Sequence, residues 1–319
     1  MGRVSETDRK APRRRRRRPL RLAALLVLLG LGGYLVVQYD STGGGGAPRC
    51  TVRAADGKSG EGSAYSLTPE QAGYASTIAA VGTAKGLPER AVTIAMATAM
   101  QESSLRNLDH GDRDSLGLFQ QRPSQGWGTP EQIMDPVYSA GIFYDRLAEV
   151  PGYSRLPLTV AAQRVQRSGF PQAYAKHEPD AVLLAAALTG RAPGALTCTG
   201  PAPLTAGDRA ALTARLERVF GPGAKPETAG GDGGVVSVPA RSARGGGAGD
   251  GDGRRGWEMA HWAVAHAAEL GIERVSYAGR SWTAGKTGGA WKAAGGSGKS
   301  ADADGRNGDD GTVRIFLAR

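Results

Sequence analysis

The chain has 319 residues and a formal charge of +10, from 40 Lys and Arg against 30 Asp and Glu. Ten of the basic residues, against only Glu6 and Asp8, fall within residues 1–21, so this short segment carries +8 of the total. The remaining chain is close to neutral and has no basic stripe interleaved with aromatic residues, which argues against nucleic-acid binding.

The basic segment 1–21 leads into an apolar run in which Leu22 to Val37 carries no charge. This run is about as short as a membrane-spanning helix can be. A dense Arg cluster on its N-terminal side fixes that side in the cytoplasm. We therefore expect a single-pass anchor over 22–39 in the cytoplasmic membrane, with the N-terminus inside and the bulk of the chain extracellular. A cleaved signal peptide is the alternative, although no small-x-small cleavage site follows the run.

Cys50 and Cys198 are the only cysteines, and both lie on the predicted outer side of the membrane. An even pair in an oxidising compartment indicates a disulfide, and two free thiols are the alternative. The bond would close a loop of about 150 residues and stabilise the fold by roughly 4 to 5 kcal/mol in chain-entropy models. The pair also brackets a segment with its own character, which suggests a stapled domain.

Residues 40–65 are Gly-rich and polar and predict a flexible stalk. Helix signals begin directly after it, where Thr68 and Gln71 form a capping-box pattern for a helix that ends near Gly86. No strand is predicted up to residue 199, so we expect 66–199 to be a compact all-α domain. Further helices are expected over 88–103, 135–149, 159–167, 171–176 and 179–189, and the capping pattern recurs at Thr129 and Gln132.

The last third of the chain is expected to be less regular. Residues 200–255 predict one amphipathic helix over 204–221 and then a disordered Gly-rich linker. Residues 256–319 predict a small α+β domain, with a helix over 257–270 and two strands of alternating polarity, "IERVSYAG" and "GTVRIFLAR". The fold class is therefore mainly α, with a transmembrane helix, an all-α domain and this small α+β domain.

The C-terminal helix contains His261 and His266, which are five residues apart. Two metal ligands on one helix face need a spacing near four, so these two side chains cannot share one metal. We expect packed or surface histidines and no metal site.

The helix over 88–103 is apolar nearly all round and delivers Glu102 on its last turn. Burial raises a carboxyl pKa, and the partial negative charge of a helix C-terminus acts in the same direction. A carboxylic acid that stays protonated at neutral pH is what glycosidic-bond cleavage needs, because the leaving oxygen must receive a proton. The alternative is a solvated glutamate at a fraying helix end.

The sequence around Glu102 resembles the soluble lytic transglycosylase and goose-type lysozyme family. The resemblance covers 66–199 and rests on "QES" at 101–103, "GLFQ" at 117–120 and the proline at 123. It implies that Glu102 is the catalytic acid and that Ser103 supports it. It also implies a cleft wall beside the sugar, built by Gly117, Leu118, Phe119 and Gln120.

Two other stretches are similar to parts of actinobacterial peptidoglycan hydrolases. "AAQRVQRSGFPQAYAKHE" at 161–178 looks like their lysozyme-like domains, which implies that Gln163 and Tyr174 face the cleft. The usual Tyr-Asn-Ala-Gly motif of the transglycosylase family is absent, and "AAQRVQ" stands in its apparent place. "GWEMAHWAVAHAAELGIERVSYAGRSWTA" resembles their C-terminal domain but lacks the metal ligands of the copies that look catalytic, which implies a wall-binding or packing role.

The resemblance leads us to expect a membrane-anchored cell-wall enzyme that cleaves the glycan strands of peptidoglycan without a cofactor. A lytic transglycosylase needs only Glu102, whereas a hydrolase needs a positioned water, for which Asp109, Asp112 and Asp114 are the local candidates. A solvated acidic loop is the alternative for these three. A different class is also open: a catalytically weak wall-binding or scaffold protein of the lysozyme fold.

Overall fold

Apart from Gly30, the predicted basic segment 1–21 and the predicted anchor 22–39 lie outside the residues that the structure describes. Within those residues, no helix is both long and apolar enough to cross a membrane. The described residues from 47 to 319 belong to one compact unit. The computed structural model describes residues 30, 47–54, 64–170, 172–200, 205–221, 224–228, 234–240, 250–285, 289–293 and 311–319.

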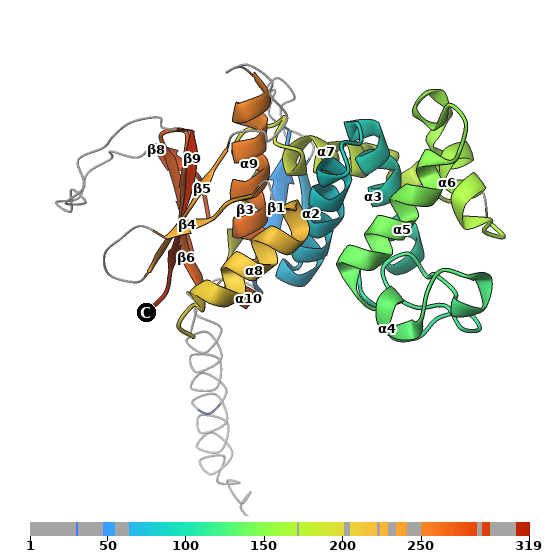
Figure 1. Cartoon of the computed structure of the whole chain (residues 1–319), viewed down its shortest axis with the longest axis horizontal. Helices are drawn as coiled ribbons and strands as arrows, with labels where there is room; N and C mark the ends of the chain where they lie inside the picture. The colour runs from blue at the N-terminus through green and yellow to red at the C-terminus, as the bar shows by residue number, and fades with distance from the viewer. Residues whose placement is uncertain are drawn as a thin grey trace, which may run out of the picture. The chain divides into compact units, whose positions relative to one another are not determined.

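The first part of the unit is helical, and its helices confirm most of the predicted segments (Figure 1). Both capping boxes form, with Thr68 Oγ1 accepting from the Gln71 amide and Thr129 Oγ1 accepting from the Gln132 amide. The helices are α2 (Pro69–Ala84), α3 (Glu89–Ser103), α4 (Pro130–Ile133), α5 (Pro136–Ala148), α6 (Leu158–Gln166) and α7 (Glu178–Leu188), with single 3-10 turns η1 (Pro123–Gln125), η2 (Tyr153–Arg155) and η3 (Ala175–His177).

The predicted helix over 171–176 is wrong, because only the short turn η3 forms there. The segment is too short to offset the cost of nucleating an α-helix by itself. It instead runs as a loop between α6 and α7, and this loop carries Tyr174.

Helix α3 is the core helix that its composition predicts. Every residue from Ala91 to Met100 is buried, and α3 packs against α2, α5, α6 and α7. The buried hydroxyls of Thr93 and Thr98 donate to the carbonyls of Glu89 and Ile94 one turn earlier, so their burial leaves no donor unsatisfied. The last turn of α3 therefore follows directly after a fully buried segment, and it is only partly buried at Gln101 and Glu102.

The predicted all-α domain and flexible stalk need correction, because a three-stranded antiparallel sheet closes this part of the fold. Its order is β2-β1-β3, with β1 (Arg49–Arg53), β2 (Ala64–Leu67) and β3 (Leu196–Thr199). In β1 the alternation of "RCTVR" buries Cys50 and Val52 on one face. Cys50 lies opposite Cys198 of β3, and the predicted disulfide between them is confirmed.

A second antiparallel sheet has the order β4-β5-β9-β6-β7-β8. The two predicted C-terminal strands are confirmed as neighbours, with Val275 opposite Ile315. The predicted disordered linker is wrong at 227–228, at 235–239 and from residue 250, because β4, β5 and the start of α9 form there. In β5, "VVSVP" buries Val236 and Val238. The strands are β4 (Glu227–Thr228), β5 (Val235–Pro239), β6 (Ile272–Tyr277), β7 (Arg280–Thr283), β8 (Lys292–Ala293) and β9 (Thr312–Leu317).

Helix α9 (Asp250–Ala265) joins the second sheet to the helical part. It packs against α2 and α7 and also against β3, β6 and β9, as Figure 1 shows for α2 and the sheet. His261 and His266 are both buried, as packed histidines would be. Helices α8 (Arg209–Phe220) and α10 (Ala267–Leu270) complete a mixed α+β fold with two antiparallel sheets.

Candidate active site

The chain turns sharply directly after Glu102, and this places its carboxyl group at the end of α3. Ser104 and Leu105 follow with φ of 55° and 57°, a left-handed conformation that side-chain-bearing residues rarely adopt. The Leu105 amide donates to the Ala99 carbonyl at 3.1 Å, and the Leu105 side chain is buried. These contacts hold the turn and stop the helix from continuing past the carboxyl group.

Glu102 is a partly buried carboxyl group that has two donors and no cationic partner among the residues that the structure describes. The Tyr174 hydroxyl donates to Glu102 Oε1 at 2.6 Å. The Gln166 side chain also hydrogen-bonds to the carboxyl group, and no basic side chain contributes to its titration. Burial raises the pKa of Glu102, while the bonds from Tyr174 and Gln166 act to lower it; burial is the larger effect.

Tyr174 is fully buried and serves as a neutral donor. Burial, followed by the charge and hydrogen bond of Glu102, holds the pKa of its hydroxyl far above the ordinary value. The hydroxyl therefore keeps its proton and always presents it to Glu102. The structure thus brings together two of the predicted site residues, although they are 72 residues apart in the chain.

Ser103 ties the end of α3 to the Gly-Leu-Phe-Gln turn. Its hydroxyl donates to the Leu118 carbonyl at 2.7 Å and accepts from the Arg106 amide at 3.2 Å. At Gly117 φ is 75°, and a Cβ there would lie 2.8 Å from the Ile133 carbonyl oxygen. Only glycine therefore fits at this position of the turn.

The side chains of Leu118 and Phe119 point into the core, where both are fully buried. Phe119 stacks on Phe143 with ring centroids 4.6 Å apart. Gln120 is the partly exposed side chain of the turn, and its amide donates to the carbonyls of His110 and Gly117. Of the turn, only Gln120 is thus partly exposed to solvent, while Gly117, Leu118 and Phe119 are buried.

On α6, Gln166 hydrogen-bonds to Glu102, whereas Gln163, the predicted cleft residue, bonds elsewhere. Gln163 Nε2 donates to the Ser168 carbonyl at 2.8 Å and shapes the loop after the helix. Gln166 Nε2 donates to the Phe119 carbonyl at 2.7 Å, which anchors this side chain between the turn and the carboxyl group. The spacing of three places both glutamines on one helix face, and that is the signal the sequence offers for Gln166.

The acidic loop does not join Glu102. Arg122 and the Ser124 amide both donate to Asp114 and hold the pKa of that carboxyl far below its usual range. Asp109 pairs with His110 at 2.7 Å, and both side chains are exposed. In the part of the chain that the structure describes, no hydrogen bond links Asp109, Asp112 or Asp114 to Glu102.

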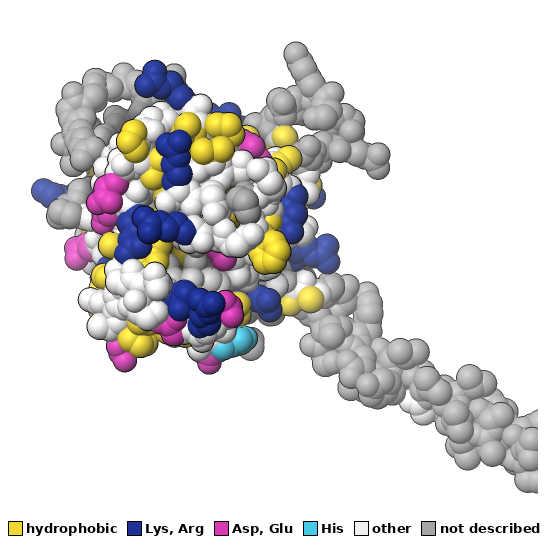
Figure 2. All heavy atoms as spheres, turned by 90° about the vertical axis from the view of Figure 1, so that its right-hand side faces the viewer, with side chains coloured by type: hydrophobic (Ala, Val, Ile, Leu, Met, Phe, Trp, Pro, Cys, Tyr) yellow, Lys and Arg dark blue, Asp and Glu magenta, His cyan; other side chains and the backbone are white. Residues whose placement is uncertain are grey.

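The surface of the helical part is polar and mixed in charge. Figure 2 looks onto the side where α4 and α6 lie in Figure 1, and it shows Lys and Arg side chains spread over the face with acidic ones among them. Phe170 is 77% exposed, the most exposed of the large apolar side chains described. It belongs to the loop between Gln166 and Tyr174, the two residues that bond to Glu102.

Comparison with known proteins gives one informative result. Residues 240–304 match the family model described as VldE, C-terminal domain, which spans α9, α10 and β6 to β8. No curated protein matches the chain. The matched residues do not include Glu102, Gln166 or Tyr174, so the chemistry of 66–199 rests on its motifs and on the site geometry.

Proposed function

We propose that the chain is a membrane-anchored cell-wall enzyme that cleaves the glycan strand of peptidoglycan, with Glu102 as its single acid and base. The observation that carries this proposal is a carboxyl group at the end of a buried helix, bonded by Tyr174 and Gln166 and, within the described part of the chain, paired with no cation. Burial raises its pKa, so a larger fraction holds the proton that a leaving sugar oxygen requires.

Glu102 first donates its proton to the glycosidic oxygen, and the bond from that oxygen to the anomeric carbon breaks. The resulting carboxylate then takes the proton of the muramic acid 6-hydroxyl as that oxygen attacks the anomeric carbon. The product is a 1,6-anhydro sugar, and Glu102 regains its proton. No second carboxylate is needed, which agrees with an acidic loop that is engaged elsewhere.

The cellular location that fits this activity is the outer side of the cytoplasmic membrane. The Cys50–Cys198 disulfide supports an oxidising compartment, and the basic and apolar N-terminal segments support an anchor. A reporter fused after residue 319 should be active only outside the membrane. Cytoplasmic activity of that fusion would contradict the location.

Mass spectrometry of purified peptidoglycan digested with the full chain tests the activity. We expect soluble fragments with 1,6-anhydro ends, and a loss of about a thousandfold or more in Glu102→Gln because a neutral amide is not acidic enough to protonate the leaving oxygen. Glu131→Gln, on exposed α4, is the matched control and should cleave normally. Reducing ends would indicate a hydrolase instead. Intact wall binding without any fragments would favour the alternative, a scaffold or wall-binding protein.

A further inference from the structure

A second polar site lies between α2, α5, α8 and α10, and Glu102 is not among the residues that line it. It is a pocket of about 440 Å³, within the size range of small-molecule sites. One face of α2 forms its floor with Gly73, Tyr74 and Thr77. Apolar side chains contribute to its walls, namely Pro69, Pro136, Val137, Ala265 and Ala268.

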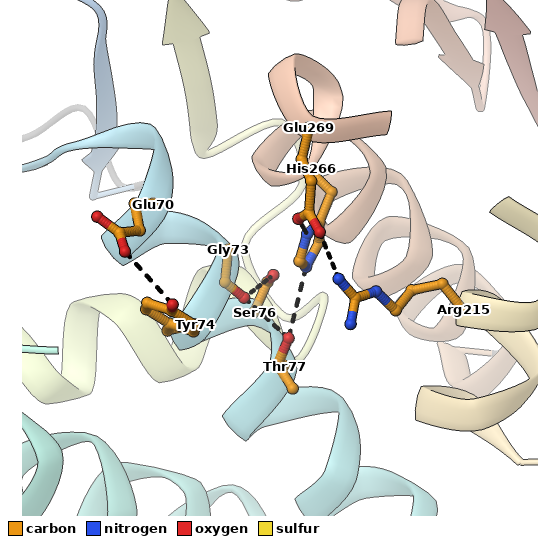
Figure 3. Close-up of polar contacts among 8 residues, drawn as sticks. All are labelled: Glu70, Gly73, Tyr74, Ser76, Thr77, Arg215, His266 and Glu269. Atoms are coloured by element: carbon orange, nitrogen blue, oxygen red, sulfur yellow. Dashed lines mark hydrogen bonds and ion pairs between the residues drawn. The ribbon is translucent and has the colours of Figure 1, made fainter. Parts of the chain in front are cut away.

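One side of the pocket is formed by polar side chains that contact one another in series (Figure 3). His266 Nε2 lies 3.4 Å from Thr77 Oγ1, and its Nδ1 lies 2.9 Å from Glu269 Oε2. The other carboxylate oxygen of Glu269 accepts from Arg215. Both oxygens of Glu269 are therefore occupied, and Arg215 balances its charge.

The other side of the pocket is open. The Tyr74 hydroxyl donates to Glu70 Oε1 at 3.3 Å, and Figure 3 shows this pair on the side of α2 away from Glu269 and Arg215. Among the described residues, no Lys, Arg or His forms an ion pair with Glu70. Glu70 thus leaves one negative charge at the pocket, next to the half-buried ring of Tyr74.

We propose that this pocket binds an alkylammonium group, with the ammonium on the Glu70 carboxylate and beside the ring of Tyr74, and with the alkyl chain against the apolar wall. A carboxylate and an aromatic ring together are the groups that attract an ammonium, through a charge-assisted hydrogen bond and a cation–π contact. The aliphatic wall of Pro136, Val137 and Ala265 matches the hydrocarbon chain behind it. The ligand is a free alkylamine or an amine-bearing side chain of a peptide.

The chain contains its own control for Glu70. The sequence Thr-Pro-Glu-Gln occurs at 68–71 and at 129–132, and both copies form a capping box at the start of a helix. Glu70 and Glu131 occupy the same position in these two capping boxes. Only Glu70 lines the pocket. A difference between the two variants therefore reports the pocket and not the helix terminus.

Isothermal titration calorimetry on the full-length chain in a non-ionic detergent tests the proposal. The probes are Nα-acetyl-lysine amide, 1,5-diaminopentane and Nα-acetyl-norleucine amide, whose side chain is that of lysine without the ammonium group. We expect the amines to bind about tenfold or more tightly than the norleucine derivative. Glu70→Gln should weaken amine binding about tenfold, whereas Glu131→Gln should leave it unchanged.

Each outcome decides the matter. Binding of diaminopentane alone assigns a free amine as the ligand, and binding of the lysine derivative assigns a peptide side chain. The proposal is overturned if the norleucine derivative binds as well as the lysine derivative, if Glu70→Gln has no effect, or if no amine binds up to about 10 mM. None of these measurements uses glycan cleavage, so they are independent of the activity proposed for Glu102.

Discussion

At the scale of single residues, Glu102 is subject to opposing influences. Burial favours its neutral form, and the donors from Tyr174 and Gln166 favour its ionised form. A raised pKa means that the folded chain binds this proton more tightly than the unfolded chain. The contribution of Glu102 to stability is therefore largest at acidic pH and falls as the pH rises through its folded pKa. The raised pKa therefore lowers the free energy of unfolding at neutral pH, and it also keeps a proton available on Glu102.

Tyr174→Phe should move the alkaline limb of the pH–rate profile to higher pH. The variant removes a donor that favours the ionised form, so the pKa of Glu102 rises further. The rate should also fall by about 10- to 100-fold, because the carboxyl group loses a contact that positions it. Both effects can be measured from the dependence of kcat/KM on pH. A fall at every pH without a shift of the limb would show that Tyr174 acts only through packing.

Phe170→Ala should weaken glycan binding while leaving the chemistry intact. Phe170 is 77% exposed beside the residues that bond to Glu102, and an exposed ring can stack on the apolar face of a sugar. We expect KM to rise about three- to tenfold with kcat nearly unchanged. The Tm should stay the same, because the ring is not part of the core. Phe170→Trp should retain affinity, and an unchanged KM in the alanine variant would exclude the contact.

At the scale of elements, the sequence predicts the helices well because their signals are local. Thr68 and Gln71 mark the start of α2 whatever the rest of the chain does. The short strands cannot be found in this way. β1 and β3 are four or five residues long and pair across more than a hundred residues, and β5 is a short apolar run in Gly-rich surroundings. Their pairing partners decide their structure, and these are known only from the fold.

The same reasoning applies to the site. Glu102 and Tyr174 are predicted because each belongs to a recognisable motif. The choice between Gln163 and Gln166 depends on where α6 ends, at Arg167 with φ of 52°, which periodicity does not fix. Leu118 and Phe119 belong to the predicted turn, but the direction of their side chains depends on Phe143 and the rest of the core.

The contact of α9 with α7 should make stability depend on pH. The His261 ring is buried and hydrogen-bonds through Nδ1 to the Ala187 carbonyl at 2.8 Å. Burial lowers the pKa of His261 to about 4. The unfolded chain therefore takes up a proton near pH 6.5 that the folded chain refuses until about pH 4. Above pH 6.5 the burial of His261 costs no stability through its protonation. As the pH drops from 6.5 to about 4, the free energy of unfolding falls by about 3 kcal/mol.

Urea unfolding at pH 7 and pH 4.5 measures this dependence. His261→Gln should be less stable than the wild type at pH 7, and its loss of stability on acidification should be smaller. His110→Gln is the control, because that side chain is 79% exposed and should leave both values unchanged. An equal acid dependence in wild type and His261→Gln would contradict the assignment to α9.

At the scale of the whole molecule, the sheet β2-β1-β3 connects the helical part to the second sheet. The Cys50–Cys198 bond staples two of its strands across a sequence separation of 148 residues. The indole N–H groups of Trp282 and Trp291 donate to the carbonyls of Cys198 and Leu196 at 3.2 and 2.9 Å. Glu258 of α9 accepts from Thr83 of α2 and pairs with Arg255. Two separate groups of contacts, the indole hydrogen bonds and the Thr83–Glu258 bond, thus cross the boundary predicted between 66–199 and 256–319.

Removal of the disulfide tests how far these contacts act together. Cys50→Ala with Cys198→Ala should lower the free energy of unfolding by about 2 to 5 kcal/mol, because the unfolded chain regains the entropy of an open loop. The indole hydrogen bonds and α9 remain, so the weakened protein should still unfold in one cooperative step. Urea unfolding followed by far-ultraviolet circular dichroism and by tryptophan fluorescence should give coincident transitions. Four of the five tryptophans lie beyond residue 256, and the fifth is Trp127. Tryptophan fluorescence therefore mainly reports the second sheet and α9. Separate midpoints for the two signals would instead show two independent domains, as the sequence alone predicts.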